Sequence, residues 1–369
     1  MENNLPVKVD DFMNTKKSKF NVTDAAYAML LFIVFNMAFS LILNFSGITY
    51  SSGSFVYFLL SFVVEALFAV VSVVVAATRR KNLVEAAGLN KKINGKMVFL
   101  CFLTSLICLV MFGDITSVFL QILSILGYKS ILGGIEMNNF AQYIGYVITT
   151  CFVAAFSEEI LFRGTILSGL KKYGVKIAVI VSALIFTLMH GNAEQTVHQF
   201  IIGLLIGYIF FVTGNFWIGF FIHFFNNFIS ITEVFILTLA SSNQAEVAET
   251  AAVQVTWLSL VFNIIAIILF AWAGLYFVKL IYKKLVSENE KLNGKKPEIE
   301  NASTVIVDGG ETEIEMAVDG KPVVESVSEE SDENSKENGM TRAATIMFIL
   351  SGLYLVANWV VHLAYGFMI

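Results

Sequence analysis

Charged residues are scarce in this sequence. They make up 14% of its 369 residues, whereas an average soluble domain has about 25%. Proline is nearly absent as well, with 3 residues, so little interrupts a long helix. Apolar residues take their place: they make up 57% of the chain and give a mean hydropathy of +0.74. The shortage of charge excludes an ordinary soluble domain, and the composition predicts an all-α polytopic membrane protein.

Cysteine is also rare, and its placement excludes a disulfide framework or a thiolate metal site. The three cysteines, Cys101, Cys108 and Cys151, lie inside apolar runs and form no Cys-x-x-Cys pair. We interpret them as small buried apolar side chains. A cleavable signal peptide is not expected either, because about 24 mostly polar residues precede the first apolar run.

Nine apolar runs are long enough, or nearly so, to cross about 30 Å of hydrocarbon as helices. Their approximate limits are 25–45, 55–78, 97–126, 141–170, 176–194, 197–213, 216–239, 256–278 and 343–366. They predict a transmembrane helical bundle with about eight core spans and a detached ninth span. The predicted domains are a cytoplasmic tail at 1–24, the bundle at 25–284, a linker at 285–342 and a C-terminal transmembrane helix at 343–369.

Basic residues gather at alternate ends of these runs, as the positive-inside rule requires of cytoplasmic loops. The predicted inner segments contain Lys8, Lys16, Lys17, Lys19, Arg79, Arg80, Lys81, Lys91, Lys92, Lys96, Lys171, Lys172, Lys176, Lys279, Lys283, Lys284, Lys291, Lys295 and Lys296. The predicted outer loops contain Lys129 alone. We therefore expect a multi-pass protein with its N-terminus in the cytoplasm and its C-terminus outside. A bacterial plasma membrane is the expected location, although no feature of the chain decides the organism.

The segment 285–342 differs from the rest of the chain. It carries fifteen acidic residues, few aromatic residues and little periodicity. Low hydrophobicity combined with high charge is typical of disorder. We predict an acidic, disordered cytoplasmic linker, and a folded soluble domain is the alternative.

Two adjacent carboxylates and an arginine interrupt the apolar run at 141–170. Glu158, Glu159 and Arg163 lie within six positions, although a charge near the bilayer centre costs about 2.5–3.5 kcal/mol. Glu159 and Arg163 have the i,i+4 spacing of a helical ion pair, with the acid first. This leaves Glu158 for another role. The cluster indicates a functional site, and a purely structural ion pair is the alternative.

Counting residues along the predicted helices places possible partners of Glu158 at the same depth in the membrane as Glu158. Glu158 lies sixteen residues before Gly174 and His190 sixteen residues after it, so both lie about 24 Å from this turn at about 1.5 Å per residue. His223 follows the next inner turn at a comparable depth, and Asn227 lies one helical turn beyond it on the same face. We expect these four side chains to meet in a cavity within the membrane that opens toward the basic inner face.

Each of these pairs also has a structural interpretation, such as helix packing or interhelical hydrogen bonding. We expect His198, near the outer face, and His362, in the ninth span, to lie outside the site. Glu65 and Asp114 either line a hydrated cavity or pair with neighbouring polar groups. The small-xxx-small pattern in the run at 197–213 predicts close helix packing rather than chemistry.

The motifs resemble those of the CPBP family of intramembrane proteases, which includes the type 2 CaaX prenyl endopeptidases and bacterial bacteriocin-processing or immunity proteins. In chain order they are Glu158-Glu159-x-x-x-Arg163, Phe186-x-x-x-His190, Phe200-x-x-Gly203-x-x-x-Gly207, Thr213-Gly214-Asn215-x-Trp217 and His223-x-x-x-Asn227. The resemblance covers roughly residues 140–230. The rest of the chain carries no motif of the family.

The resemblance implies an endopeptidase that cleaves a membrane-associated peptide or protein, of CaaX or leader-peptide type. By the same resemblance, Glu158 with His190 would activate water, and His223 with Asn227 would form an oxyanion hole. It assigns supporting roles to Glu159 and Arg163.

The family has also been described as metal-dependent. Glu158, His190 and His223 would then hold Zn²⁺ with a water in the fourth position. No His-Glu-x-x-His motif is present, and a glutamate-based mechanism needs no further ligand. We favour the metal-free mechanism with no cofactor and keep Zn²⁺ as the alternative.

Two other classes of function remain open at this stage. One is a non-catalytic immunity or scaffold protein of the same fold. The other is a proton-coupled transporter that uses the carboxylates and histidines as a relay, although we find no internal repeat of the kind many transporters have. In every case the partners are the lipid bilayer and a membrane-associated molecule, and no nucleic acid is expected.

Overall fold

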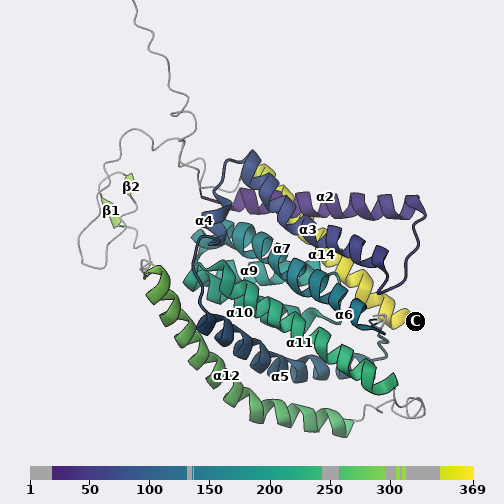
Figure 1. Cartoon of the computed structure of the whole chain (residues 1–369). Coiled ribbons are helices and arrows are strands. Elements are labelled where there is room, and N and C mark those ends of the chain that lie inside the picture. Colours follow the sequence, from purple (N-terminus) through teal and green to yellow (C-terminus); the bar gives the residue numbers. More distant parts are fainter. Residues whose placement is uncertain are drawn as a thin grey trace, which may run out of the picture.

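The computed structural model describes residues 19–130, 135, 137–242, 257–295, 305–307, 310–312 and 341–369, and Figure 1 shows their arrangement. The predicted tail at 1–24 and linker at 285–342 lie largely outside these residues. The elements in chain order are α2 (Val22–Ser46), α3 (Phe55–Thr78), α4 (Leu83–Ala87), α5 (Gly95–Ile125), α6 (Phe140–Tyr146), η1 (Val147–Val153), α7 (Ala154–Glu159), η2 (Ile160–Leu167), α8 (Ser168–Leu170), η3 (Lys171–Tyr173), α9 (Gly174–Met189), α10 (Thr196–Thr213), α11 (Phe216–Ser242), α12 (Trp257–Asn293), β1 (Val305–Val307), β2 (Gly310–Thr312) and α14 (Arg342–Met368).

The predicted fold class is confirmed: the chain forms an all-α, polytopic helical bundle. Within the described residues, seven helical runs are long and apolar enough to cross a membrane. One of them, Phe140–Met189, contains two predicted spans, because the chain reverses at Gly174, whose φ of 82° suits glycine. The short strands β1 and β2 pair as an antiparallel hairpin within the segment predicted to be the linker.

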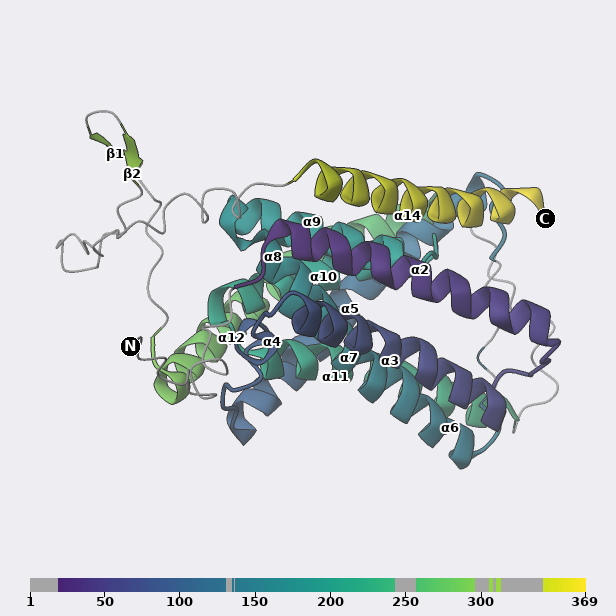
Figure 2. The same ribbon diagram turned by 90° about the horizontal axis from the view of Figure 1, so that it is seen from above.

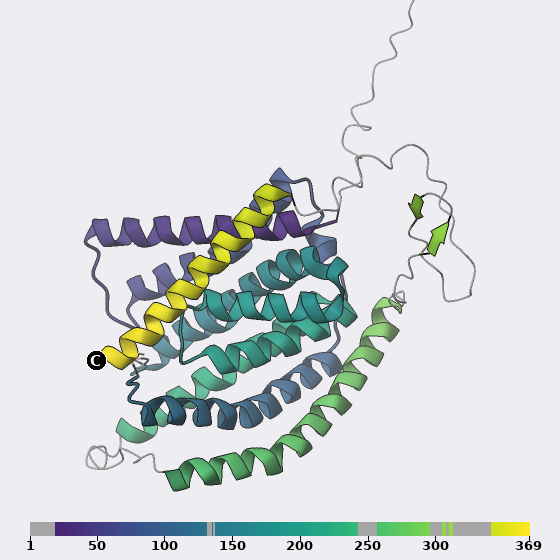
Figure 3. The same ribbon diagram turned by 180° about the vertical axis from the view of Figure 1, so that it is seen from behind.

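The bundle is built in layers around the segment from η1 to α8. This segment packs against α2 and α3 on one side and against α9 and α11 on the other. Beyond them, α5 lies between α11 and α12, and α12 curves along the edge of the molecule, as Figure 3 shows. The central position of η1 to α8 explains why Ser157 to Leu170 are buried without exception.

The basic loops meet at one end of the bundle, where hydrogen bonds join them. The amide of Asn215 donates to the Lys92 carbonyl at 3.0 Å and to Asn289 at 2.8 Å, and the Trp217 indole donates to the Leu89 carbonyl at 3.2 Å. Thr213-Gly214-Asn215-x-Trp217 is therefore a structural turn. Asn289 lies on α12, which continues to Asn293, so the first residues of the segment predicted as the linker are helical.

The prediction of a detached ninth span was wrong. Figure 2 shows α14 lying beside α2, and α14 also contacts α9. Its side chains reach the loop after α9: the Trp359 indole donates to the Thr196 hydroxyl at 2.7 Å, and the Ala193 amide donates to Nδ1 of His362 at 3.2 Å. The sequence did not predict the packing of α14 on α2 and α9, because the hydropathy of an apolar run does not show which helices it contacts.

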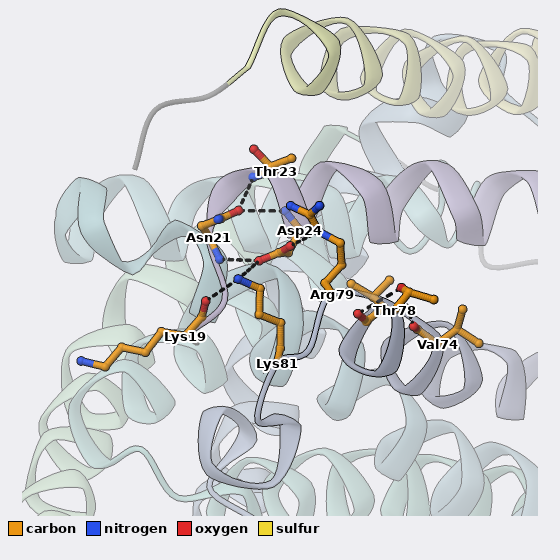
Figure 4. Close-up of polar contacts among 9 residues, drawn as sticks. Lys19, Asn21, Thr23, Asp24, Val74, Thr78, Arg79 and Lys81 are labelled. Atoms are coloured by element: carbon orange, nitrogen blue, oxygen red, sulfur yellow. Dashed lines mark hydrogen bonds and ion pairs between the residues drawn. The ribbon is translucent and has the colours of Figure 1, made fainter. Parts of the chain in front are cut away.

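A buried ion cluster anchors the start of α2 to the end of α3, as Figure 4 shows. Asp24 is fully buried and pairs with Arg79 at 2.9 Å and with Lys81 at 3.2 Å. The Asp24 carboxylate also accepts from the backbone N–H of Asn21, whose own side chain caps the helix. Such a capping box satisfies helix donors that would otherwise lack partners.

We predict that Asp24→Asn lowers the free energy of unfolding by about 3–5 kcal/mol, because it breaks the buried ion pair between Asp24 and Lys81. Thermal unfolding in detergent measures the change. As the matched control, Glu288→Gln removes an ion pair to the exposed Lys96 and is expected to cost less than about 1 kcal/mol. Equal losses in the two variants would contradict this account.

Candidate active site

The two adjacent glutamates lie on α7, between two stretches of wide helical turn. η1 and η2 are π-helical, with Glu158 and Glu159 on the α-helical turns between them. Wide turns of this kind are frequent at functional sites, where they rotate side chains away from the regular spacing. They aim two neighbouring carboxylates at different partners.

Glu159 forms the predicted ion pair with Arg163, at 2.9 Å, and both side chains are almost completely buried. The guanidinium also lies over the ring of Phe186, 4.9 Å from its centroid, and donates to the Gly203 carbonyl at 3.4 Å. A Cβ on Gly219 would come within 3.0 Å of the Glu159 carboxylate. The pair is therefore held by three helices and requires small residues beside it.

His223 joins this pair to Glu158. Its Nδ1 lies 3.0 Å from Oε1 of Glu159, and its Nε2 lies 3.9 Å from Oε2 of Glu158. Because the Glu159 carboxylate can only accept, Nδ1 carries the hydrogen in that bond. Nε2 is the nitrogen left for Glu158 and for a molecule beside it.

His190 is held in a matching way at the end of α9. Its Nδ1–H donates to the Phe186 carbonyl at 2.8 Å, which leaves Nε2 as its reactive nitrogen. The Phe186 ring packs edge-on against His190, at 4.8 Å between centroids, and against His223, at 5.8 Å. Phe186 thus spaces the two imidazoles and supports Arg163.

Asn227 belongs to a chain of polar groups on α11. Its amide donates to the Thr150 carbonyl at 2.9 Å and accepts from Asn226 at 3.3 Å. Asn226 also contacts Nε2 of His198 at 3.1 Å. An amide group has two N–H hydrogens, so Asn227 retains one for another acceptor.

One cavity of about 1140 Å³ brings these groups together. Glu158, His190, His223 and Asn227 all line it, together with Glu65, His198 and Asn226. The predicted convergence of four side chains from three spans is therefore present in the structure. His198, which the sequence placed outside the site, lies on the cavity wall. Of Asp114, the structure describes only the backbone.

The expected direction of the opening was wrong. From Glu158 the cavity runs to the exposed residues Lys129 and Ser130, at the end of the bundle away from Lys171 and Lys172. Counting residues along the helices predicts that the four side chains lie at one depth in the membrane. It does not predict whether the helices separate on the cytoplasmic or the outer side of these side chains.

Polar contacts around Glu194 hold the residues at the rim of the cavity together. This buried carboxylate accepts from the Tyr128 hydroxyl at 3.1 Å and from the Ser130 hydroxyl at 2.7 Å. Burial and the neighbouring Glu194 raise the pKa of Tyr128 to about 12, which keeps it protonated as a donor. The contacts of α14 with Ala193 and Thr196 fix the same loop, which follows His190 directly.

The donor set does not have the geometry of a metal site. Within the described residues, no group of three His, Cys, Asp or Glu side chains is placed to hold a metal ion. Glu158, His190 and His223 share the cavity but do not close around one point. We therefore derive no step through a metal.

The two glutamates are predicted to affect stability in opposite ways. Glu159→Gln leaves the buried guanidinium of Arg163 uncompensated and is expected to cost about 3–5 kcal/mol. Glu158→Gln removes a charge that lacks an arginine or lysine partner, so this variant should be at least as stable as the wild type. Thermal unfolding of both variants in one detergent tests the pair, and a less stable Glu158→Gln variant would contradict it.

We also predict that α14 holds the loop bearing His190. Trp359→Phe and His362→Ala each remove one hydrogen bond to that loop, at a cost of about 0.5–1.5 kcal/mol. Hydrogen exchange across residues 190–196 should therefore quicken by up to about tenfold. Val361→Ala, on the exposed face of α14, is the control. Unchanged exchange in both variants would show that α14 does not secure the loop.

Comparison with known proteins identifies the segment that carries the site. Residues 140–229 match the family model described as type II CAAX prenyl endopeptidase Rce1-like. The match covers about a quarter of the chain and includes every motif from Glu158 to Asn227. It supports the resemblance to the CPBP intramembrane proteases. No curated protein and no solved structure matches the chain.

Proposed function

We propose that this chain, whose residues 140–229 match the type II CAAX prenyl endopeptidase model, hydrolyses a peptide bond of a membrane-associated substrate with water activated by Glu158. The observation that carries the proposal is the shared cavity. Glu158, His190, His223 and Asn227 come from three separate helical segments and line one space that reaches the surface. If the Glu159–Arg163 ion pair only stabilised the helix bundle, no polar cavity beside it would be needed.

Glu158 is the group best placed to take a proton from water. It lies in the cavity wall, and its Oε2 has no hydrogen-bond partner among the described residues. The Arg163 charge next to it is already paired with Glu159, so Glu158 keeps its basicity. General base catalysis by a positioned carboxylate accelerates a reaction by about 10²–10⁴-fold.

The two histidines and Asn227 supply the remaining polar contacts. His223 contacts Glu159 through Nδ1 and presents Nε2 on the side of Glu158. We propose that a hydrogen on this Nε2 stabilises the oxyanion in the transition state. The second N–H of Asn227 is the other donor. Nε2 of His190 accepts from the attacking water and helps to orient it.

The direction of the cavity bears on where the substrate enters. If the basic loops face the cytoplasm, as the positive-inside rule requires, the cavity opens on the opposite side of the membrane. We propose that the scissile bond is reached from the outer leaflet or the space beyond it. A secreted leader or a lipid-anchored peptide suits that route.

We predict that Glu158→Gln abolishes proteolysis while the protein remains folded. The substrate is first identified by comparing membrane-associated peptides from cells that express the wild-type or the Glu158→Gln protein. Cleavage is then measured with purified protein in proteoliposomes. Loss of at least about 10²-fold in kcat is expected.

Glu233→Gln is the matched control, because Glu233 lies exposed on α11 and does not line the cavity. It should retain full activity. A Glu158→Gln variant that cleaves as fast as the wild type would end the protease proposal. Full biological activity of this variant without any cleavage would favour an immunity or scaffold role instead.

A further inference from the structure

A third carboxyl group reaches the cavity from a helix that carries no family motif. Glu65, on α3, lines the same cavity as Glu158, and the two carboxyl groups lie side by side, where a shared proton would join them. Its Oε2 is buried and has no hydrogen-bond partner among the described side chains. α3 packs directly on α7, so this contact is part of the helix interface.

The charges nearby cannot neutralise both groups. Arg163 pairs with Glu159, and His223 contacts Glu159 at 3.0 Å but Glu158 only at 3.9 Å. Two carboxylates in contact within an apolar bundle do not both ionise, because like charges repel strongly where water is scarce. A hydrogen bond between two carboxyl groups also requires a proton on one of them. We therefore expect the pair to hold one proton at rest.

We propose that Glu65 and Glu158 form a carboxyl pair that shares one proton, and that Glu65 is a further catalytic residue of the proposed endopeptidase. The inference rests on the proposed function and deepens it. Glu158 alone can take the proton from the attacking water. We assign to the pair the second step of the reaction, in which the leaving amine must receive a proton.

The proton balance closes over one turnover. Water gives a proton to Glu158 while its oxygen adds to the peptide carbonyl, and the pair then holds two protons. The carbon–nitrogen bond breaks as the pair donates one proton to the departing nitrogen. The products are a carboxylic acid and an amine, and the pair again holds one proton. This scheme needs no group beyond water and the two carboxyls.

The other ionisable groups around the pair have assigned partners. From α7 and η2, Glu159 and Arg163 pair with each other, and from α11, His223 is held by Glu159. From the end of α9, His190 is held by a backbone carbonyl. Glu65 is therefore the group in contact with Glu158 that has a proton to share.

The test separates attack from departure of the leaving group. Glu65→Gln keeps the volume of the side chain and a donor to Glu158 but carries no transferable proton. It is assayed on two probes: the substrate peptide, and a 4-nitrophenyl ester of the residues that precede the scissile bond. The nitrophenolate leaves without protonation, so the ester does not require the proposed acid.

We expect Glu65→Gln to lower kcat for the peptide by about 10²-fold or more with KM unchanged, while ester hydrolysis stays within a few-fold of wild type. Retained ester hydrolysis also shows that the variant is folded. Glu158→Gln should lose both activities, and Glu233→Gln should lose neither.

Two results would overturn the inference. One is wild-type peptide cleavage by Glu65→Gln. The other is an equal loss of both activities in Glu65→Gln, which would indicate a structural role for Glu65. If Glu158→Gln itself cleaves the peptide normally, the proposed function fails, and that outcome is distinct from a failure of the pair.

Discussion

The ion pair between Glu159 and Arg163 is the constraint on which the rest of the site depends. A guanidinium buried among apolar helices requires an anion beside it. Glu159 supplies this anion, and the Gly203 carbonyl and the face of Phe186 add further contacts. The same carboxylate then fixes the tautomer of His223. One buried charge thus determines the orientation of an imidazole on another helix.

The close approach of the helices follows from the same pair. A Cβ on Gly203 would lie only 3.3 Å from side chains of α9, and Gly219 leaves room for the Glu159 carboxylate. Small residues let helix backbones approach in a membrane, where packing rather than hydrophobic exclusion drives association. The predicted packing role of the small-xxx-small pattern is confirmed, since a Cβ on Gly207 would touch residues of η2 and α9.

Beyond the ion pair, the helices separate and leave a polar space. The proposed hydrolysis requires water beside the scissile bond, and the cavity provides room for it between α3, α7 and α11. The contacts of α14 and Tyr128 with the loop at 190–196 keep the far wall of this space in place. A stable wall matters because small displacements of catalytic groups reduce rates strongly.

The sequence by itself determined the all-α membrane fold, the i,i+4 ion pair and the common depth of Glu158 and His190, because length, hydropathy and helical spacing are local properties. Only the tertiary structure decided that α14 packs on α2 and secures the loop after His190, that the cavity opens away from the basic loops, and that Glu65 meets Glu158. Those features depend on how helices are rotated and which become neighbours. Many packings of similar apolar surfaces satisfy the same hydropathy pattern, so the pattern does not distinguish among them.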